Sequence, residues 1–401
     1  MKPSHIDWCP MIPDHWEEKR IKDIAFLQSG NSITAMDFVE DGKFPVYGGN
    51  GLRGYTNTYT NEGDYVLIGR QGALCGNINY AHGKFYASEH AVVVYPKKEE
   101  ITLWLGETLR TANLNRLSMT AAQPGLAVST LNLQFIPFPP KDERIRIAKY
   151  LDKKLSEIDH QVSLLTSKRD AYLRLKKSII NHAVTRGLNP NVKMKDSGIE
   201  WIGEVPEHWE VKRMKDIFFE RKELSLTGEE DLLSVSEFYG VARRKDKMNS
   251  DEEFESRADS LVGYKICKAH DLVINIMLAW KTGLGISDND GIVSPAYAVY
   301  EGRNIASHFY HYLLRSGMYV KEFKRHSKGI IDSRLRLYND RFNNISAIYP
   351  PLPEQRAIAT YLDDKCAKID TIVANLDKQI SRYGDLKRSL IDEVITGKRA
   401  V

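Results

Sequence analysis

The sequence has little cysteine and no long apolar run. Its four cysteines (Cys9, Cys75, Cys267 and Cys366) are widely spaced in 401 residues, with no Cys-x-x-Cys pair and no histidine at zinc-ligand spacing. This pattern argues against a disulfide framework and predicts buried, reduced thiols without a bound metal. No apolar stretch reaches the roughly 18 residues of a membrane span, and the N-terminal segment has charges and prolines where a signal peptide has an apolar core. We therefore expect a soluble cytoplasmic protein.

The motifs of nucleotide and methyl-transfer enzymes are also missing. There is no P-loop, no Asn-Pro-Pro-aromatic motif of adenine methylation, and no G-x-G-x-x-G at a strand-helix junction. His15 and His208 are the best lone candidates for acid-base chemistry, but each adjoins a tryptophan, Trp16 or Trp209, and has no paired acid or nucleophile nearby in sequence. We interpret the histidines as packing or helix-start residues and the tryptophans as core or partner anchors, and we expect no catalytic site.

Neither charge sign dominates, because the formal net charge is only +4. Global charge therefore does not indicate a nucleic-acid partner. Cationic residues do gather locally, in one run from Val241 to Lys247 and another from Lys324 to Arg336. Both runs are candidate phosphate-facing loops, and solvated surface is the alternative.

The chain repeats two segments. Residues Ile12–Ile24 match Val205–Ile217 at an offset of 193, and Pro139–Asp159 recurs as Pro350–Asp370 at an offset of 211. The second register continues without a gap as far as Thr185 and Thr396. The segments between these anchors, 25–138 and 218–349, show no comparable similarity, so two halves share a frame around different modules.

The second repeated segment has the 3.5-residue spacing of a coiled coil, with Lys176 and Lys387 among the few polar seam positions. Such a helix is about 60 Å long at 1.5 Å per residue and needs a long partner. The other copy is the simplest partner, and two-fold-related halves would make the pair antiparallel; a dimerisation stalk unrelated to DNA is the alternative. The seam residues are Leu151, Leu155, Ile158, Val162, Leu165, Leu362, Ile369, Val373, Leu376 and Ile380.

Both variable modules have the composition of α+β domains. Ten of the 27 glycines fall between Gly42 and Gly83, and short β-branched runs predict strands over 44–55, 64–69, 91–95, 271–277 and 291–300. Helices are expected over 101–117 and 306–323. Long donors in the turns and loops suit base or phosphate contacts. The candidate DNA-binding residues are Asn50, Arg53, Arg70, Gln71, Arg243, Arg244, Lys245, Lys281, Lys328, Arg334 and Arg336.

These patterns predict an α+β protein with two globular domains separated by two long antiparallel coiled-coil helices in a pseudo-two-fold internal repeat. The expected domains are 1–140 and 205–351, the expected helices are 141–187 and 352–401, and 188–204 is the expected linker.

The repeated motifs resemble the conserved regions of type I restriction-modification specificity subunits. The Pro-Pro-x-x-Glu-(Gln/Arg)-x-x-Ile-Ala-x-Tyr-Leu-Asp element opens each long helix, and (Ile/Val)-Pro-x-His-Trp-Glu opens each half. The modules are similar to target-recognition domains through Phe44-Pro-Val-Tyr-Gly-Gly49, Gly69-Arg-Gln-Gly72 and Gly291-Ile-Val-Ser-Pro-Ala-Tyr297. The family has Glu-Gln after the proline pair, which Glu354-Gln355 matches and Glu143-Arg144 does not.

The resemblance implies that each target-recognition domain reads one half of a bipartite, asymmetric DNA site, and that the coiled coil sets the unread spacer. It also implies docking of two methyltransferase subunits and recruitment of translocase-nuclease subunits. S-adenosylmethionine, ATP and Mg²⁺ are expected on those partners and not on this chain. The alternatives are a scaffold that pairs two identical protein partners without DNA and, third, a nuclease or methyltransferase acting alone. A DNA reader would lose affinity as salt rises.

Overall fold

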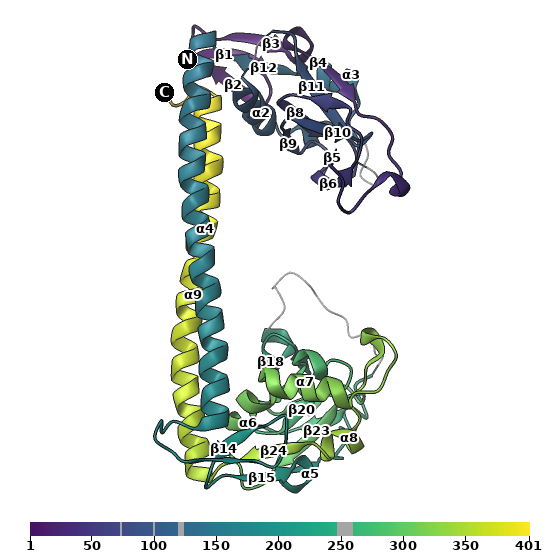
Figure 1. Ribbon diagram of the computed structural model, residues 1–401, viewed down its shortest axis with the longest axis vertical. Coiled ribbons are helices and arrows are strands. Elements are labelled where there is room, and N and C mark those ends of the chain that lie inside the picture. Colours follow the sequence, from purple (N-terminus) through teal and green to yellow (C-terminus); the bar gives the residue numbers. More distant parts are fainter. Residues whose placement is uncertain (73, 99–100, 119–123, 247–259) are drawn as a thin grey trace. The chain divides into compact units, whose positions relative to one another are not determined.

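The computed structural model describes the chain except for residues 73, 99–100, 119–123 and 247–259. It divides into two compact units, one formed by Met1–Thr166 with Asp377–Val401 and the other by Ser167–Leu376. Each unit holds one globular α+β domain and about half of each of two long helices, α4 (Lys141–Arg186) and α9 (Leu352–Ile395), as Figure 1 shows. The predicted fold class, with two mixed domains and two long antiparallel helices, is confirmed.

The first domain is built on an antiparallel four-stranded sheet in the order β4-β11-β8-β9. Its two central strands, β8 and β11, are apolar and covered on both faces, so that the consecutive residues Ala91–Val94 are all buried. A second sheet, β6-β5-β10-β7, carries the glycine-rich hairpin, with β5 and β10 parallel. The strands are β1 (Lys2–Ile6), β2 (Cys9–Ile12), β3 (Glu17–Arg20), β4 (Ala25–Ser29), β5 (Phe44–Gly48), β6 (Gly51–Thr56), β7 (Asn61–Glu62), β8 (Tyr65–Gly69), β9 (Ile78–Ala81), β10 (Lys84–Ala87), β11 (Ala91–Pro96) and β12 (Phe135–Phe138).

The second domain repeats the main sheet of the first although its sequence differs, and in place of the second sheet it has two antiparallel strand pairs, β17-β18 and β19-β22. Its main sheet is antiparallel in the order β16-β23-β20-β21, and β15 pairs with β24 as β3 pairs with β12. Residues 188–204 include β13, which pairs with β14. The strands are β13 (Met194–Asp196), β14 (Glu204–Pro206), β15 (Glu210–Arg213), β16 (Phe218–Glu220), β17 (Leu233–Ser236), β18 (Gly240–Arg243), β19 (Lys265–Cys267), β20 (Leu272–Ile274), β21 (Leu284–Ile286), β22 (Gly291–Val293), β23 (Ala298–Gly302) and β24 (Ser346–Tyr349).

The short helices cover the sheets and connect them. In the first domain they include α2, which packs on β8 and β9. In the second, α6 packs on β21. The short helices of the described chain, these two included, are α1 (Ile21–Ile24), η1 (Ala35–Asp37), α2 (Thr102–Thr111), η2 (Leu114–Leu117), α3 (Val128–Asn132), α5 (Met214–Ile217), η3 (Arg244–Asp246), η4 (Ala279–Lys281), α6 (Ser307–Leu314), α7 (Gly317–His326), η5 (Asp332–Arg334) and α8 (Asn339–Asn343).

Two predicted helices were wrong in their extent. The segment 306–323 forms two helices, because Ser316 adopts an extended backbone (φ −68°, ψ 152°) and starts a new helix at Gly317. The segment 101–117 is interrupted after Thr111, where Asn113 takes a left-handed conformation (φ 46°). The strand expected over 291–300 is likewise split between β22 and β23, since a proline at position 295 cannot donate to a sheet ladder. In each of these places a single residue interrupts the helix or strand that the apolar pattern predicted.

The long helices run antiparallel in both units. In the first, Lys387 Nζ donates to Asp159 Oδ1 at 2.7 Å, and in the second Lys176 Nζ donates to Asp370 Oδ1 at 2.6 Å. Asp159 and Asp370 occupy equivalent positions in the repeat, as do the two lysines. The polar seam residues therefore form the same cross-helix ion pair twice, and a parallel pairing of the copies would set like charges opposite each other.

The seam residues differ in burial along the helices. Leu151 and Leu362 are fully buried, and Leu155, Ile158, Ile369 and Leu376 are at most 9% exposed. Leu151, Leu155 and Ile158 belong to the core of the first unit, and Leu362 belongs to that of the second. The remaining seam residues, Val162, Leu165, Val373 and Ile380, are half-buried.

The repeated His-Trp segment anchors each domain to the helices. His15 Nε2 lies 2.9 Å from Glu143 Oε2, and His208 Nε2 lies 2.7 Å from Glu354 Oε2. The neighbouring Trp16 and Trp209 are 1% and 0% exposed, so the predicted packing and helix-start role of these pairs is confirmed. All four cysteines are buried and unpaired, as predicted. Across the described residues, no helix is both long and apolar enough to cross a membrane.

Candidate nucleic-acid interface

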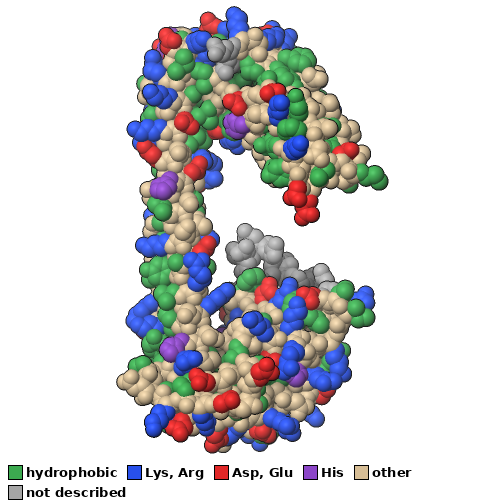
Figure 2. Space-filling model, viewed as in Figure 1, with side chains coloured by type: hydrophobic (Ala, Val, Ile, Leu, Met, Phe, Trp, Pro, Cys, Tyr) green, Lys and Arg blue, Asp and Glu red, His purple; other side chains and the backbone are tan. Residues whose placement is uncertain are grey.

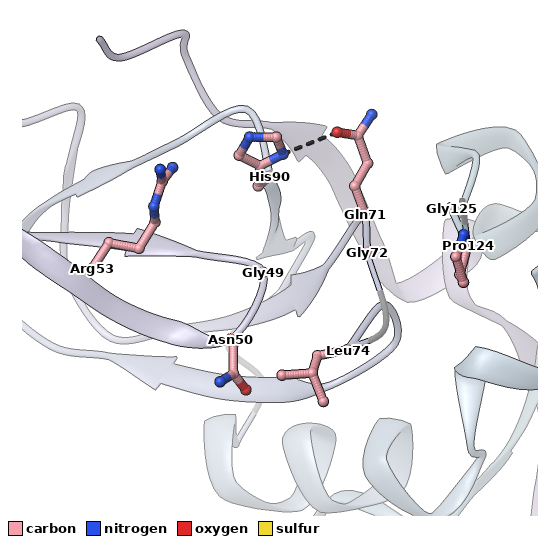
Figure 3. A pocket seen from close by; sticks show the side chains of 9 residues that line it. All are labelled: Gly49, Asn50, Arg53, Gln71, Gly72, Leu74, His90, Pro124 and Gly125. Carbon is pink, nitrogen blue, oxygen red and sulfur yellow. Dashed lines mark hydrogen bonds between the residues drawn. The ribbon is translucent and has the colours of Figure 1, made fainter. Parts of the chain in front are cut away.

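A pocket in the first domain collects donors from three turns that are distant in sequence. It is lined by Asn50 and Arg53 of the β5–β6 hairpin, Gln71 after β8, and His90 before β11 (Figure 3). Gly49, Gly72, Leu74, Pro124 and Gly125 complete the lining. Three of the four donors predicted in this domain, Asn50, Arg53 and Gln71, therefore share one concave site. Polar groups converging on a concave surface are what groove recognition needs.

Glycine makes this pocket sterically possible. A Cβ on Gly48 would lie 2.3 Å from Arg53 Cδ, and a Cβ on Gly49 would lie 3.2 Å from the His90 carbonyl oxygen. The Arg53 guanidinium carbon stands 5.6 Å from the centroid of the Phe38 ring, which supports the cation on one side. The glycines therefore leave room beside the backbone for a ligand, next to an arginine whose guanidinium stacks near the Phe38 ring.

Arg70 has a different position from its neighbour Gln71, because its side chain is not part of the pocket lining. Its backbone holds the site together: Arg70 N donates to the His90 carbonyl at 2.9 Å, and Leu126 N donates to the Arg70 carbonyl at 2.9 Å. Arg70 thus joins the turns that carry the pocket.

The second domain places Lys281 beside a tryptophan that the sequence did not single out. Lys281 Nζ and Lys324 Nζ lie 4.9 and 5.0 Å from the ring centroid of Trp280. Lys324 also pairs with Asp332 at 3.0 Å, at the start of the helix turn that contains Arg334. The aromatic ring holds two cations near each other, so we add Trp280 to the candidate DNA-binding residues of the second domain.

The loop after α7 is closed by a backbone bridge. Lys328 N donates to the Arg336 carbonyl and Arg336 N donates to the Lys328 carbonyl, both at 2.9 Å. Ile330, between them, is fully exposed, and Arg334 is exposed as well. The three predicted cations Lys328, Arg334 and Arg336 therefore lie on one pinned loop with an apolar tip.

The other cationic run is partly neutralised. Arg243 Nε and Lys245 Nζ lie 3.3 and 2.7 Å from the two oxygens of Asp231, and the hydrogen bond from Lys245 lowers the Asp231 pKa. Arg244 begins the short η3 helix beside them. Lys247, the last residue of this run, lies outside the described residues. Paired cations remain available to phosphate only by exchanging partners, so this run is a weaker candidate than Lys281 and the pinned loop.

Arg315 was missed by sequence reasoning and organises the second domain. Its Nη1 donates to the carbonyls of Thr282 and Leu284 at 2.7 and 2.6 Å. Its Nη2 donates to the carbonyls of Glu237 and Phe238 at 3.0 and 3.1 Å. One guanidinium thus joins the β17–β18 hairpin to the turn that follows Lys281. No local pattern marks this role, because all its acceptors are distant backbone carbonyls.

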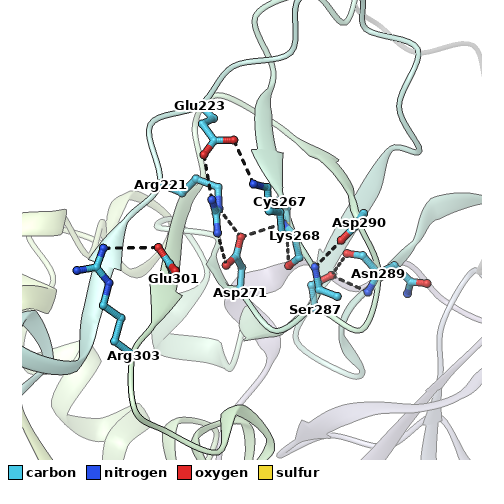
Figure 4. A network of polar contacts seen from close by, with 11 residues as sticks. Arg221, Glu223, Cys267, Lys268, Asp271, Ser287, Asn289, Asp290, Glu301 and Arg303 are labelled. Carbon is cyan, nitrogen blue, oxygen red and sulfur yellow. Dashed lines mark hydrogen bonds and ion pairs between the residues drawn. The ribbon is translucent and has the colours of Figure 1, made fainter.

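A second polar network in this domain connects two strands of the main sheet, β16 and β20 (Figure 4). Arg221 Nε and Nη2 donate to the two carboxylate oxygens of Asp271 at 2.7 and 3.1 Å. The side chains are only 10% and 4% exposed, and hydrogen bonding to Asp271 raises the pKa of Arg221. Lys268 N also donates to Asp271, at 2.8 Å. The bidentate pair fixes the end of β16 against the start of β20.

Burial of His311 predicts an acid-sensitive second domain. Desolvation, with Arg315 and His308 nearby, lowers the pKa of His311 from 6.5 to about 3, so the ring is neutral when folded. The unfolded chain takes up this proton below pH 6.5, so the stability is complete above that pH and is lost as pH falls towards 3. We expect about 2 kcal/mol of unfolding free energy to be lost between pH 6.5 and 4.5 from this group.

Urea unfolding of the full chain at both pH values would measure this loss. The matched variant His311→Asn keeps an acceptor for the Ile286 N–H, which lies 3.3 Å from His311 Nδ1, and should show a smaller pH dependence. Equal pH dependence in the two proteins would rule out His311 as the cause.

On the face drawn in Figure 2, lysine and arginine side chains are interspersed with acidic ones over both units. This distribution agrees with the net charge of +4. Among the described residues on that face no single cationic field marks the interface, so the pocket and loops are recognised by their local geometry.

Comparison with known proteins identifies the family. The family model described as "Type I restriction modification DNA specificity domain" matches residues 13–164 and again residues 206–382. The chain belongs to this family. The two matches agree with the prediction of two target-recognition domains. They identify the chain as a type I specificity subunit, a family whose domain is described as conferring DNA specificity.

Individual relatives agree with this assignment. The chain is 40% identical over 141 residues to the type I restriction enzyme EcoprrI specificity subunit of Escherichia coli, covering 34% of this chain and 35% of that one. It is 22% identical over 417 residues to the MjaVIII specificity subunit of Methanocaldococcus jannaschii, covering 96% and 93%. A solved chain from a study of type I R-M complex assembly and conformational transition covers 97% of this chain and 100% of its own, with 14% identity and a TM-score of 0.68, and shares the fold.

Proposed function

We propose that this specificity subunit reads a bipartite, asymmetric DNA sequence, one half with each domain, and has no catalytic step of its own. The observation that carries the proposal is the pair of family-model matches, because each covers a globular domain that has its own core and the same order of strands in its main sheet. Two equivalent domains with different surface residues suit two different half-sites.

In the first domain, base contacts come from the pocket formed by Asn50, Arg53 and Gln71. In the second, Lys281 and the pinned loop with Lys328, Arg334 and Arg336 approach the DNA. Supported guanidinium and amide groups suit base edges, whereas lysines suit phosphates. These assignments rest on the geometry of the pocket and of the loop.

The helix pair sets the length of the unread DNA spacer between the half-sites. It is also the frame on which two methyltransferase subunits dock. Two copies of one partner require two equivalent surfaces, and the frame supplies repeated contacts: His15 with Glu143 and His208 with Glu354. S-adenosylmethionine belongs to the methyltransferase, and ATP and Mg²⁺ belong to a translocase-nuclease. The complex works in the cytoplasm.

Mapping methylated adenines across a host genome tests this function. The chain is co-expressed with its cognate methyltransferase subunit and compared with the methyltransferase subunit alone, using long-read sequencing. A bipartite motif that appears only with the chain is the expected result. Unchanged methylation, together with binding to DNA that does not weaken as salt rises, would favour a protein scaffold instead.

A further inference from the structure

Both amide side chains in the pocket of the first domain have their oxygens occupied inside the protein. Asn77 Nδ2 donates to Asn50 Oδ1 at 3.1 Å. Gln71 Oε1 lies 2.9 Å from His90 Nδ1, and Figure 3 shows the amide nitrogen of Gln71 pointing away from the ring. With its oxygen turned towards a partner inside the protein, such an amide presents mainly its NH₂ group to a ligand.

The surroundings of His90 hold the Gln71 amide in this orientation. His90 Nε2 lies 3.2 Å from Glu89 Oε1, and Glu89 Oε2 accepts a hydrogen bond from Ile33 N at 3.3 Å. The Gln71 oxygen faces Nδ1 and the Glu89 carboxylate faces Nε2, so the His90 ring has a partner at each nitrogen. Glu89 and His90 therefore act as positioning residues that orient Gln71 from behind.

We infer that this pocket turns hydrogen-bond donors towards the DNA and therefore reads a guanine in the first half-site. The donors are Asn50 Nδ2, Gln71 Nε2 and the guanidinium of Arg53. In the major groove guanine offers two acceptors, N7 and O6, whereas adenine offers one acceptor and one donor. Reading adenine with both groups of an amide needs the amide oxygen, which is engaged here with His90 or Asn77.

This inference rests on the proposed function, because it names the base that the first domain selects. Gln71→Ala in the full chain, assembled with its methyltransferase subunit, should relax specificity at one base pair of the first half-site. That pair should be G·C. Replacing its guanine with 7-deazaguanine, which lacks the N7 acceptor, should weaken wild-type binding by about tenfold, whereas inosine, which keeps N7 and O6, should bind as guanine does.

Removing the positioning contact should change the preference without abolishing binding. In His90→Leu the Gln71 amide is free to turn and can offer both its oxygen and its nitrogen to adenine. We expect the preference for guanine over adenine at that position to fall by about tenfold. His82→Leu is the matched control, because His82 pairs with Asp64 at 3.0 Å in the same domain and does not line the pocket.

Gln71→Glu provides a nearly isosteric second variant that presents a carboxylate in place of the donor. It should lose the preference for guanine while the full chain still binds its second half-site. Competition binding with duplexes that differ at single base pairs of the first half-site measures all these variants.

The outcomes separate this inference from the proposed function. If the wild-type complex shows no bipartite preference, the proposed function fails. If the bipartite preference is present but Gln71→Ala relaxes an A·T pair or none, the inference alone fails. Equal weakening on every duplex would show that Gln71 contacts phosphate, and that result would also overturn the inference.

Discussion

Exchanging residues 25–138 for the corresponding segment of another specificity subunit will change one half of the methylated motif and leave the other half unaltered. The segment contains the main sheet and pocket of the first domain, and its last strand, β12, meets the constant β3 through backbone hydrogen bonds over Phe135–Phe138. Backbone pairing does not depend on side-chain identity, so a foreign module can keep this junction.

The reciprocal exchange of residues 218–349 serves as the matched control. Here β24 meets the constant β15 in the same way, with Ser346–Tyr349 opposite Glu210–Arg213. Each hybrid is expressed with the methyltransferase subunit, and its motif is read by long-read sequencing. The first hybrid should alter one half-site and the second hybrid the other. A hybrid that alters both half-sites would contradict independent reading by the two domains.

The frame, which consists of the His-Trp segments and the two long helices, was predictable from sequence because its sequence occurs twice in the chain. The heptad pattern and the repeated His-Trp segment are local, and their contacts in the structure connect the repeated positions, as His208 connects to Glu354. Asn50, Arg53 and Gln71 could be proposed because glycine-rich turns beside long donors are visible in a short window. Their convergence in one pocket depends on sheet pairing, which no short window shows.

The residues that sequence analysis missed act over long separations. His90 matters because it meets Gln71, and Arg315 matters because it reaches the carbonyls of Glu237 and Thr282. A lone histidine or a helical arginine gives no local signal of such roles. The break in the helix expected over 306–323 was different, because the Ser316-Gly317 pair is a recognisable helix-start signal that the apolar pattern hid.

Removing one heptad from the middle of each long helix will shorten the spacer of the recognised sequence without altering either half-site. The deletions should be Thr166–Tyr172 and Ala374–Ile380, which lie along the chain between the partners of the Asp159–Lys387 and Lys176–Asp370 pairs and at equal sequence separations from them. A heptad starting at Leu151 or Leu362 would instead remove residues buried in the cores of the domains.

The expected change follows from the helix geometry. Seven residues shorten a helix by about 10 Å, which corresponds to at most about three base pairs of B-DNA at 3.4 Å each. Deleting the heptad from α4 alone is the matched control, because it puts the cross-helix ion pairs out of register and should reduce activity on every spacer. Methylation of duplexes whose spacers differ by single base pairs measures both variants. An unchanged spacer in the double deletion would show that the distance between half-sites is set by something other than the helix pair. A changed half-site would show that the helices also orient the surfaces that read bases.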